Sequence, residues 1–428
     1  MKTEHIGSAS CIINQQEFKP RVNPFAPVRA GDRIEARAFA HIRRQAVLEG
    51  CKWDPQVGDV GTLAPFPLLL RRSVWNQLAT WAEQLAEETI CAEHEILQRP
   101  ELLKVLGINA PLRRALRGSD PITPAAARSM RFDFHPTAEG WQVSEVNSDV
   151  PGGFTESSFF TDLIAEHVPF ACPAGNPAET WASSVASAAR RNGTVCLLSA
   201  PGFMEDHQIM AYLAKQLRAH GCRTHLANPS QISWRDGRAS LDTAWFRGRV
   251  DALVRFYQGE WLPRLPRRCG WRHYIRGGCT PVTNPGSAII SESKRLPTIW
   301  NQLSTALPTW RRLLPPTRDP CEAPWRTDHD WVLKSAFSNT ADHVYIRPVV
   351  NERDWRKLEW EVWLSPWKWL AQRRFDSVPV DTPQGPLHAC IGVYAINGKA
   401  AGAYGRLAPR PLIDYAAIDA AVLIEDDD

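Results

Sequence analysis

The sequence predicts a mixed α/β (α+β) fold, and three observations support this class. Apolar residues recur at helical spacing through much of the segment from about 32 to 117. Polar and aromatic residues alternate from Arg131 to Phe134, as in a strand with one buried face. A strand, a helix and a second strand follow one another between Thr194 and Ala227. At 428 residues, the chain is long enough for two or three domains.

The N-terminal part is expected to be mainly helical. One helix is predicted over 34–49 and a longer one over 75–97, with Ser73 as a possible N-cap residue. A proline-rich stretch over 55–67 separates the two helices. The longer helix has apolar residues near helical spacing at Leu78, Trp81, Leu85 and Ile90. No catalytic constellation is recognisable in this part.

A hairpin with an unusual set of polar residues is expected next. Turn residues lie between His135 and Gly140, and the return strand places Glu145 and Asn147 on one face. Antiparallel pairing turns Asp133 toward that face. Two carboxylates and an amide oxygen are ligands that suit Mg²⁺.

Arg131 stands beside these candidate metal ligands and indicates that a phosphate or a carboxylate is handled there. The alternative is a hairpin whose polar face is only solvated. A glycine-bearing turn, Ser148 to Phe154, follows the return strand, and its glycines allow the backbone to approach a ligand closely.

A doubly wound layer is predicted after the hairpin. A buried strand at 194–199, a helix at 209–219 and a strand at 224–227 form a βαβ unit, in which ligands lie at the carboxyl ends of strands. Glu205 and Asp206 fall in the loop at that end. Acidic residues are also favoured at a helix N-terminus by the helix dipole, so a purely structural role is the alternative.

Composition narrows the possible functions. The net charge is only +4, with basic residues scattered, so neither nucleic acid nor a membrane is an expected partner. The start of the chain lacks an apolar segment and no run approaches about 18 apolar residues, so a cytoplasmic protein is expected. Five tryptophans between 355 and 369 are expected to pack in a core or between domains rather than to stack on bases.

The hairpin resembles that of the glutathionylspermidine synthase family of ATP-grasp amide ligases. These proteins carry an R-F-D-F strand and an E-x-N-[AS]-D strand end that hold Mg²⁺ and an acyl phosphate. The matching residues, with the same intervening length, are Arg131, Asp133, Glu145, Asn147 and Asp149. The resemblance continues from about Arg128 onward and is weaker before it.

The resemblance implies further site residues. Lys294 and Lys334 correspond to two lysines that bind the phosphates of ATP, and the strand over 369–375, which contains Gln372, corresponds to the hinge that reads adenine. Arg406 corresponds to an arginine near the reacting phosphoryl group. The resemblance also places Glu205 and Asp206 near the amine substrate and Arg255 near the active site.

Two departures from the family separate this chain from its namesake reaction. The segment from Ser335 to Asp342 has no glycine, whereas the family has a G-R-x-G loop that covers the phosphates. Val150, Pro151, Gly152 and Gly153 replace small polar residues at the glutathione end, and the amidase domain of some members is absent. Glutathione and spermidine are therefore not expected as substrates.

The resulting prediction is an ATP-dependent carboxylate–amine ligase that uses ATP and Mg²⁺. Its expected substrates are a small-molecule or peptide acid and an amine. The expected parts are a helical part over 1–120, a Rossmann-like substrate domain with the hairpin over 121–270, and an ATP-grasp lobe over 271–428. The alternatives are a catalytically weakened nucleotide-binding or scaffold protein and, less favoured, a tryptophan-rich nucleic-acid binder.

Overall fold

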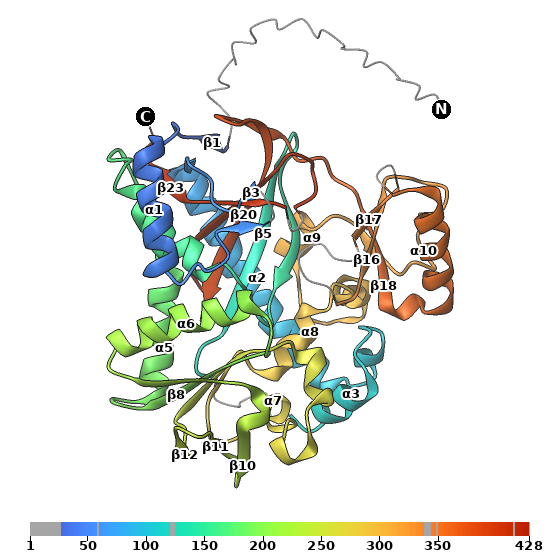
Figure 1. Cartoon of the computed structure of the whole chain (residues 1–428). Coiled ribbons are helices and arrows are strands. Elements are labelled where there is room, and N and C mark those ends of the chain that lie inside the picture. The colour runs from blue at the N-terminus through green and yellow to red at the C-terminus, as the bar shows by residue number, and fades with distance from the viewer. Residues whose placement is uncertain are drawn as a thin grey trace, which may run out of the picture.

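A computed structural model shows a mixed α/β architecture built on several sheets, as the sequence predicts. The central antiparallel sheet and the strands around helix α10 lie on different sides of the molecule, with the α5 and α6 layer below them in Figure 1. The structure describes residues 27–57, 60–119, 125–337, 344–347, 350–413 and 416–427.

The central sheet contains the predicted hairpin. Its strand order is β22-β21-β20-β5-β6, with β19 also paired to β20, and every pairing is antiparallel. The strands are β5 (Ser129–Thr137), β6 (Gly140–Asn147), β19 (Pro379–Thr382), β20 (Gly385–Ile396), β21 (Lys399–Ala408) and β22 (Ile418–Ala420). The sheet thus joins residues from the second and third predicted parts of the chain.

The turn of this hairpin is shorter than expected. Pro136 stays in the strand opposite Trp141, and the chain reverses within residues 138–139. Gly140 has a φ of +117°, which suits glycine, and the Thr137 hydroxyl donates to the Gly140 carbonyl at 2.7 Å. The predicted turn over 135–140 was therefore too long, because proline was taken as the end of the strand.

Helix α2 (Arg72–Gln98) packs against β20 and β21 and begins before the predicted start. Ser73 is not its N-cap; it lies in the first turn, where its hydroxyl and amide bind Asp427. The other helices of the N-terminal part are α1 (Ala36–Leu48) and α3 (Ala110–Leu116). The apolar residues that α2 buries are Leu78, Ala82, Leu85, Ala86, Ala92 and Ile96.

The N-terminal part also supplies strands. A second sheet, ordered β1-β4-β23-β7, pairs β4 in parallel with the strand closest to the C-terminus. Its members are β1 (Arg29–Ala30), β4 (Leu68–Arg71), β7 (Ala171–Pro173) and β23 (Val422–Glu425), and a two-stranded sheet joins β2 (Gln56–Val57) to β3 (Val60–Gly61).

The predicted βαβ layer is confirmed as a four-stranded parallel sheet ordered β14-β13-β8-β9. Helix α6 (Met204–Ala219) begins five residues before its predicted start, so Glu205 and Asp206 lie in its first turn rather than in a loop. The other elements are α5 (Pro177–Ala189), β8 (Thr194–Ser199), β9 (Arg223–Ala227), β13 (Ala252–Phe256) and β14 (Val282–Thr283). A small sheet of β10 (Ile232–Arg235), β11 (Arg238–Asp242) and β12 (Arg247–Arg249) extends beyond this layer.

A fourth sheet, ordered β15-β18-β16-β17, is antiparallel and carries helix α10. The elements are α9 (Pro308–Leu313), β15 (Thr317–Arg318), β16 (Trp331–Ser335), β17 (Val344–Ile346), α10 (Glu352–Leu364) and β18 (Trp369–Arg373). Of the five clustered tryptophans, Trp355 and Trp369 are buried here as expected. Trp360, Trp363 and Trp367 are more than half exposed, so the packing expectation was wrong for them.

Three short helices connect these layers: α4 (Thr161–Ala165), α7 (His273–Arg276) and α8 (Ile289–Glu292). A π-helical segment, Glu156–Phe160, leads directly into α4. Within the described residues, none of the helices has the length and apolar character needed to cross a bilayer.

Candidate active site

A cavity of about 730 Å³ contains most of the residues singled out from the sequence. Ten of the eleven predicted site residues line it, and Arg255 does not. The ten come from the central sheet, α6, the segment after α8 and the fourth sheet; they are Arg131, Asp133, Glu145, Asn147, Glu205, Asp206, Lys294, Lys334, Gln372 and Arg406.

The hairpin places Arg131 and Asp133 on the cavity wall. Their partners across the strands are Asn147 and Glu145, as the period of two predicts, although a β-bulge follows Asp133. Arg131 donates from Nε and Nη2 to the two carboxylate oxygens of Asp133, at 2.8 and 3.0 Å. The amide of Asn147 also donates to Asp133, at 3.1 Å. The Asp133 carboxylate is therefore held rigidly by one cation and one amide.

Gly392 allows Arg131 to take this position. It lies opposite Asp133 on β20, and a Cβ atom there would come within 2.7 Å of Arg131 Cδ. The Arg131 guanidinium also lies over the ring of Tyr404, 5.1 Å from the ring centre, and donates to the Gly152 carbonyl at 3.0 Å. The glycine-bearing turn after the hairpin thus contacts the predicted catalytic arginine.

The two predicted lysines lie on either side of Glu145. Lys294 pairs with the Glu145 carboxylate at 3.2 Å, and Lys334 donates to the Ser144 carbonyl at 3.4 Å. Burial lowers the pKa of Lys334 to about 8, and the charge of Lys294 adds to this. Burial also opposes the charge on Lys294, but Glu145 outweighs it and raises the pKa of Lys294. Two buried ammonium groups with one carboxylate between them form a site that favours an anion.

Gln372 lies on the strand next to Lys334. Strand β18 pairs with β16, so that Gln372 is opposite Val332, and its amide donates to the Thr317 hydroxyl at 3.0 Å. The segment that follows Lys334 reaches Phe337 within the described residues; its part over 338–342, and with it most of the predicted glycine-free loop, lies outside them.

The chemistry of the predicted metal ligands suits Mg²⁺. No group of three or more His, Cys, Asp or Glu side chains is arranged for a metal in the described part of the chain. Asp133, Glu145 and Asn147 are instead two carboxylates and an amide, and Mg²⁺ commonly takes only one or two protein carboxylates with phosphate and water. Both carboxylates are at present paired with Arg131 and Lys294. The oxygen donors fit the ion, provided that these cations turn toward phosphate when it binds.

Glu205 and Asp206 lie on a different wall, formed by the first turn of α6. Burial raises the pKa of Asp206 to about 7, and the charge of Glu205 contributes. Burial and the nearby Asp54 carboxylate raise the pKa of Glu205. A pair of carboxylates whose charges are this costly is stabilised by a bound cation.

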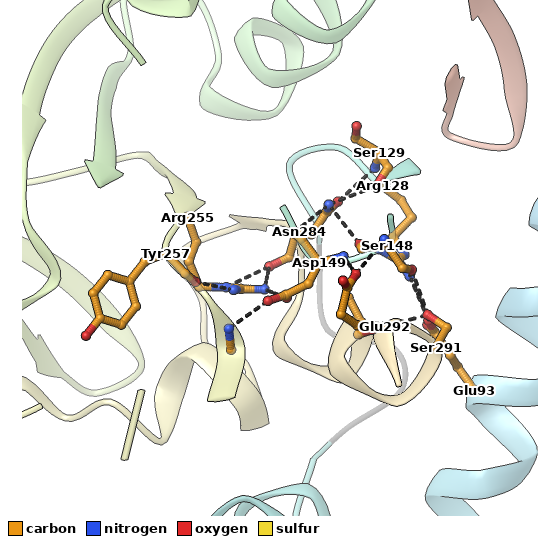
Figure 2. Close-up of polar contacts among 12 residues, drawn as sticks. Glu93, Arg128, Ser129, Ser148, Asp149, Arg255, Tyr257, Asn284, Ser291 and Glu292 are labelled. Atoms are coloured by element: carbon orange, nitrogen blue, oxygen red, sulfur yellow. Dashed lines mark hydrogen bonds and ion pairs between the residues drawn. The ribbon is translucent and has the colours of Figure 1, made fainter. Parts of the chain in front are cut away.

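Arg255 lies outside the cavity, in the buried network of Figure 2. It forms an ion pair with Asp149 in which both side chains are fully buried, and it donates to the carbonyls of Tyr257 and Asn284. Asp149 also accepts from the Gly259 amide at 2.6 Å. The network therefore joins the end of the hairpin to β13.

The same network reaches the segment that carries Lys294. The carboxylate of Glu292 accepts from the backbone amides of Ser148 and Asp149, at 2.7 and 2.8 Å, as Figure 2 shows. Arg128 bridges Ser148 and Glu93 of helix α2. Hydrogen bonds from four separate parts of the chain thus fix the end of the hairpin relative to Lys294.

Sequence reasoning missed a third group of site residues. Lys52 and Asp54, from the N-terminal part in which no constellation was recognised, line the cavity with Glu156 and Asp419. Lys52 contacts all three carboxylates, at 2.5 to 3.3 Å. No short motif announces this group, because its members are separated by up to 367 residues.

Comparisons with known proteins agree with this geometry. The sequence profile described as "Glutathionylspermidine synthase preATP-grasp" matches residues 70–418. A glutathione synthetase-like effector from Globodera pallida, in its apo form, has a similar structure, with a TM-score of 0.61 and 14% identity over 90% of this chain and 96% of that one.

A putative γ-glutamylcysteine synthetase from Methylobacillus flagellatus is more distant. Its TM-score is 0.38 at 12% identity, over 74% of this chain and 82% of the other. No curated protein sequence matches significantly. Because the profile covers most of the sequence, the chain belongs to the glutathionylspermidine synthase preATP-grasp family.

Proposed function

We propose that this protein joins a carboxylic acid to an amine at the expense of ATP, with ADP and phosphate as products. The observation that carries the proposal is one cavity that unites Lys294 and Lys334, the Asp133 and Glu145 carboxylates, and Arg131. The synthetase-like family supports a ligase, and the present geometry supports a reaction of phosphoryl transfer followed by acyl transfer.

In this proposal, the two lysines and Gln372 bind ATP. Lys294 and Lys334 balance the charge of the phosphates, and β18, with Gln372, lies against the adenine. Asp133, Glu145 and Asn147 hold Mg²⁺, which neutralises phosphate charge when bound. These roles use the buried charges of the site without any change of fold.

Arg131 and Arg406 act on the reacting groups. The substrate carboxylate attacks the γ-phosphorus, ADP leaves, and an acyl phosphate forms whose oxygens the two guanidinium groups stabilise. The amine nitrogen then attacks the acyl carbon and inorganic phosphate leaves. Glu205 and Asp206 hold the amine, and Asp206, with its pKa near 7, is suited to accept the proton that the nitrogen loses.

The test is release of ADP that depends on added acids and amines, together with oxygen-18 labelling of the acid. The acyl-phosphate route moves one labelled oxygen from the carboxylate into phosphate. Release of AMP and pyrophosphate, or label that stays wholly in the amide product and unused acid, would exclude this route.

Two substitutions separate catalysis from folding. Glu145→Gln keeps the side-chain shape and removes its charge, and Arg131→Lys keeps the charge and removes the planar fork; each should lower turnover by roughly 10²-fold or more. Glu179→Gln is the matched control, because Glu179 is an exposed partner of His220 on α5, outside the cavity. Wild-type turnover in both site variants would contradict the assignment.

A nucleotide-binding or scaffold protein without turnover is the second candidate. It is favoured by the ion pairs of Arg131 with Asp133 and of Lys294 with Glu145, which satisfy the site internally. Saturable binding of Mg²⁺-ATP with no ADP release across the pooled acids and amines would establish this candidate instead.

A further inference from the structure

The group around Lys52 is a buried cluster of one cation and three anions. The Lys52 ammonium lies 2.5 Å from Glu156, 3.1 Å from Asp54 and 3.3 Å from Asp419. Its three N–H donors therefore have three carboxylate acceptors. With all four groups ionised, the cluster keeps a charge of −2, since one positive charge faces three negative ones.

One acceptor of this cluster has no donor. The Oε2 atom of Glu156 is buried and has no hydrogen-bond partner among the described residues, although Glu156 lines the cavity and is only 5% exposed. An unsatisfied buried carboxylate oxygen is unfavourable and is usually explained by a ligand, an ion or a water molecule. Glu156 also begins the π-helical segment, a distortion often found at functional sites.

The position of the cluster relates it to the reacting carboxylate. The Tyr404 hydroxyl donates to Asp419 at 2.7 Å, and the ring of the same tyrosine lies beneath the Arg131 guanidinium. A single aromatic side chain thus separates the cluster from the proposed carboxylate-binding arginine. A molecule whose carboxylate lies at Arg131 reaches the cluster with a group only a few bonds away.

We propose that this cluster binds a protonated amino group of the acid substrate, which is then an amino acid or a short peptide rather than a simple carboxylic acid. This inference rests on the proposed ligase function. A primary ammonium group supplies both the positive charge and the N–H donors that the cluster lacks. Glu205 and Asp206 remain for the nitrogen that is acylated.

A length series of acids tests this inference. Glycine, β-alanine, 4-aminobutyrate, 5-aminovalerate and 6-aminohexanoate are each compared with the unsubstituted acid of the same length, with pooled amines as acceptors. One or more of the amino acids should exceed its unsubstituted partner in kcat/KM by at least about 10-fold, because a charged hydrogen-bonded group is lost in the partner. Thermal stabilisation of the protein by each acid, with Mg²⁺ and a non-hydrolysable ATP analogue, gives a second readout that needs no turnover.

Glu156→Gln assigns the preference to the cluster. It should raise KM for the preferred amino acid about 10-fold and leave kcat/KM for the unsubstituted acid within about twofold. Lys52 keeps two carboxylate partners in this variant, so that folding is preserved. Glu179→Gln serves as the matched surface control.

Equal use of amino and unsubstituted acids would overturn the inference while leaving the ligase intact. A preference that Glu156→Gln does not change would also overturn it, as would an effect of Glu156→Gln that follows the amine substrate and not the acid. Absence of ADP release with every acid removes the ligase function itself; the inference fails with it unless amino acids alone stabilise the wild-type protein and not Glu156→Gln.

Discussion

Lys334 is the residue whose charge is most sensitive to pH near neutrality. Its pKa of about 8 arises from burial and from Lys294, and a bound triphosphate favours the charged form. ATP affinity should therefore fall as the pH rises above about 8, by up to about tenfold per pH unit. Titration of ATP binding between roughly pH 6.5 and 9.5 measures this dependence.

Lys334→Met is the control for this titration, since it should bind ATP more weakly with a flatter pH profile. The effect on stability has the opposite sign. Between a folded pKa near 8 and an unfolded value of about 10.4, the unfolded chain binds more protons, so this residue's contribution to stability rises with pH. An unchanged profile in Lys334→Met would assign the titration to another group.

The buried Asp149–Arg255 pair is expected to be structural. Both side chains are fully buried, so Asp149→Asn leaves a buried guanidinium without its counter-charge and should cost about 3–5 kcal/mol of unfolding free energy. Asp242→Asn provides the comparison, because its ion pair with Arg247 is exposed and should contribute at most about 1 kcal/mol. Urea denaturation of both variants measures the difference; similar losses would contradict the structural role.

Sequence motifs located the residues that are close together in the chain better than those that are distant. Arg131, Asp133, Glu145 and Asn147 were predicted to share one face because the strand period is two and the hairpin is local. The Lys52 cluster escaped prediction because its contacts depend on how distant elements pack. Arg255 matched a motif but lies in the buried network, because spacing alone does not reveal which way a side chain points.

At the scale of elements, strand type was easier to predict than element ends. The run over 194–199 was identified from its apolar residues, and parallel pairing on both sides confirms it. The starts of α2 and α6 were missed, since neither helix has a side-chain N-cap hydrogen bond to mark where it begins. Glu205 and Asp206 consequently lie in a helical turn, which keeps the helix dipole as a contributor to their preference for this position.

Helix α10 offers a test of the two kinds of tryptophan it carries. Trp355 is buried against Trp325, whereas Trp360 is 64% exposed. Trp355→Ala should cost about 3–5 kcal/mol, and Trp360→Ala should change the unfolding free energy by less than about 0.5 kcal/mol. Thermal or chemical denaturation compares them; a large loss in Trp360→Ala would show that this indole is covered in solution.

At the scale of the whole molecule, the sheets cross the predicted boundaries. Strand β5 from the second predicted part pairs with β20 from the third, and β4 from the first pairs with β23. The domain limits near 120 and 270 remain predictions. Local periodicity indicates that a strand exists but does not reveal its partner when hundreds of residues intervene. The cavity lies where these long-range pairings meet, so its outline was beyond the reach of motif spacing.

Nucleotide and metal should bind to this molecule as a coupled pair. The two ion pairs neutralise the site internally, so ATP alone would draw Lys294 away from Glu145 and leave a buried carboxylate uncompensated. Mg²⁺ alone would meet carboxylates that Arg131 and Lys294 already occupy. Each ligand therefore removes the main obstacle to the other.

We expect Mg²⁺-ATP at about 100 times its Kd to raise the unfolding free energy by about 2.7 kcal/mol. ATP with EDTA, or Mg²⁺ alone, should give only a small part of this gain. Glu145→Gln should narrow the difference between ATP with and without Mg²⁺, because it removes both the metal ligand and the partner of Lys294. A melting temperature indifferent to saturating Mg²⁺-ATP would contradict the nucleotide site. Equal stabilisation by ATP in EDTA would contradict the metal site, since the carboxylates then need no cation beyond those that the protein itself supplies.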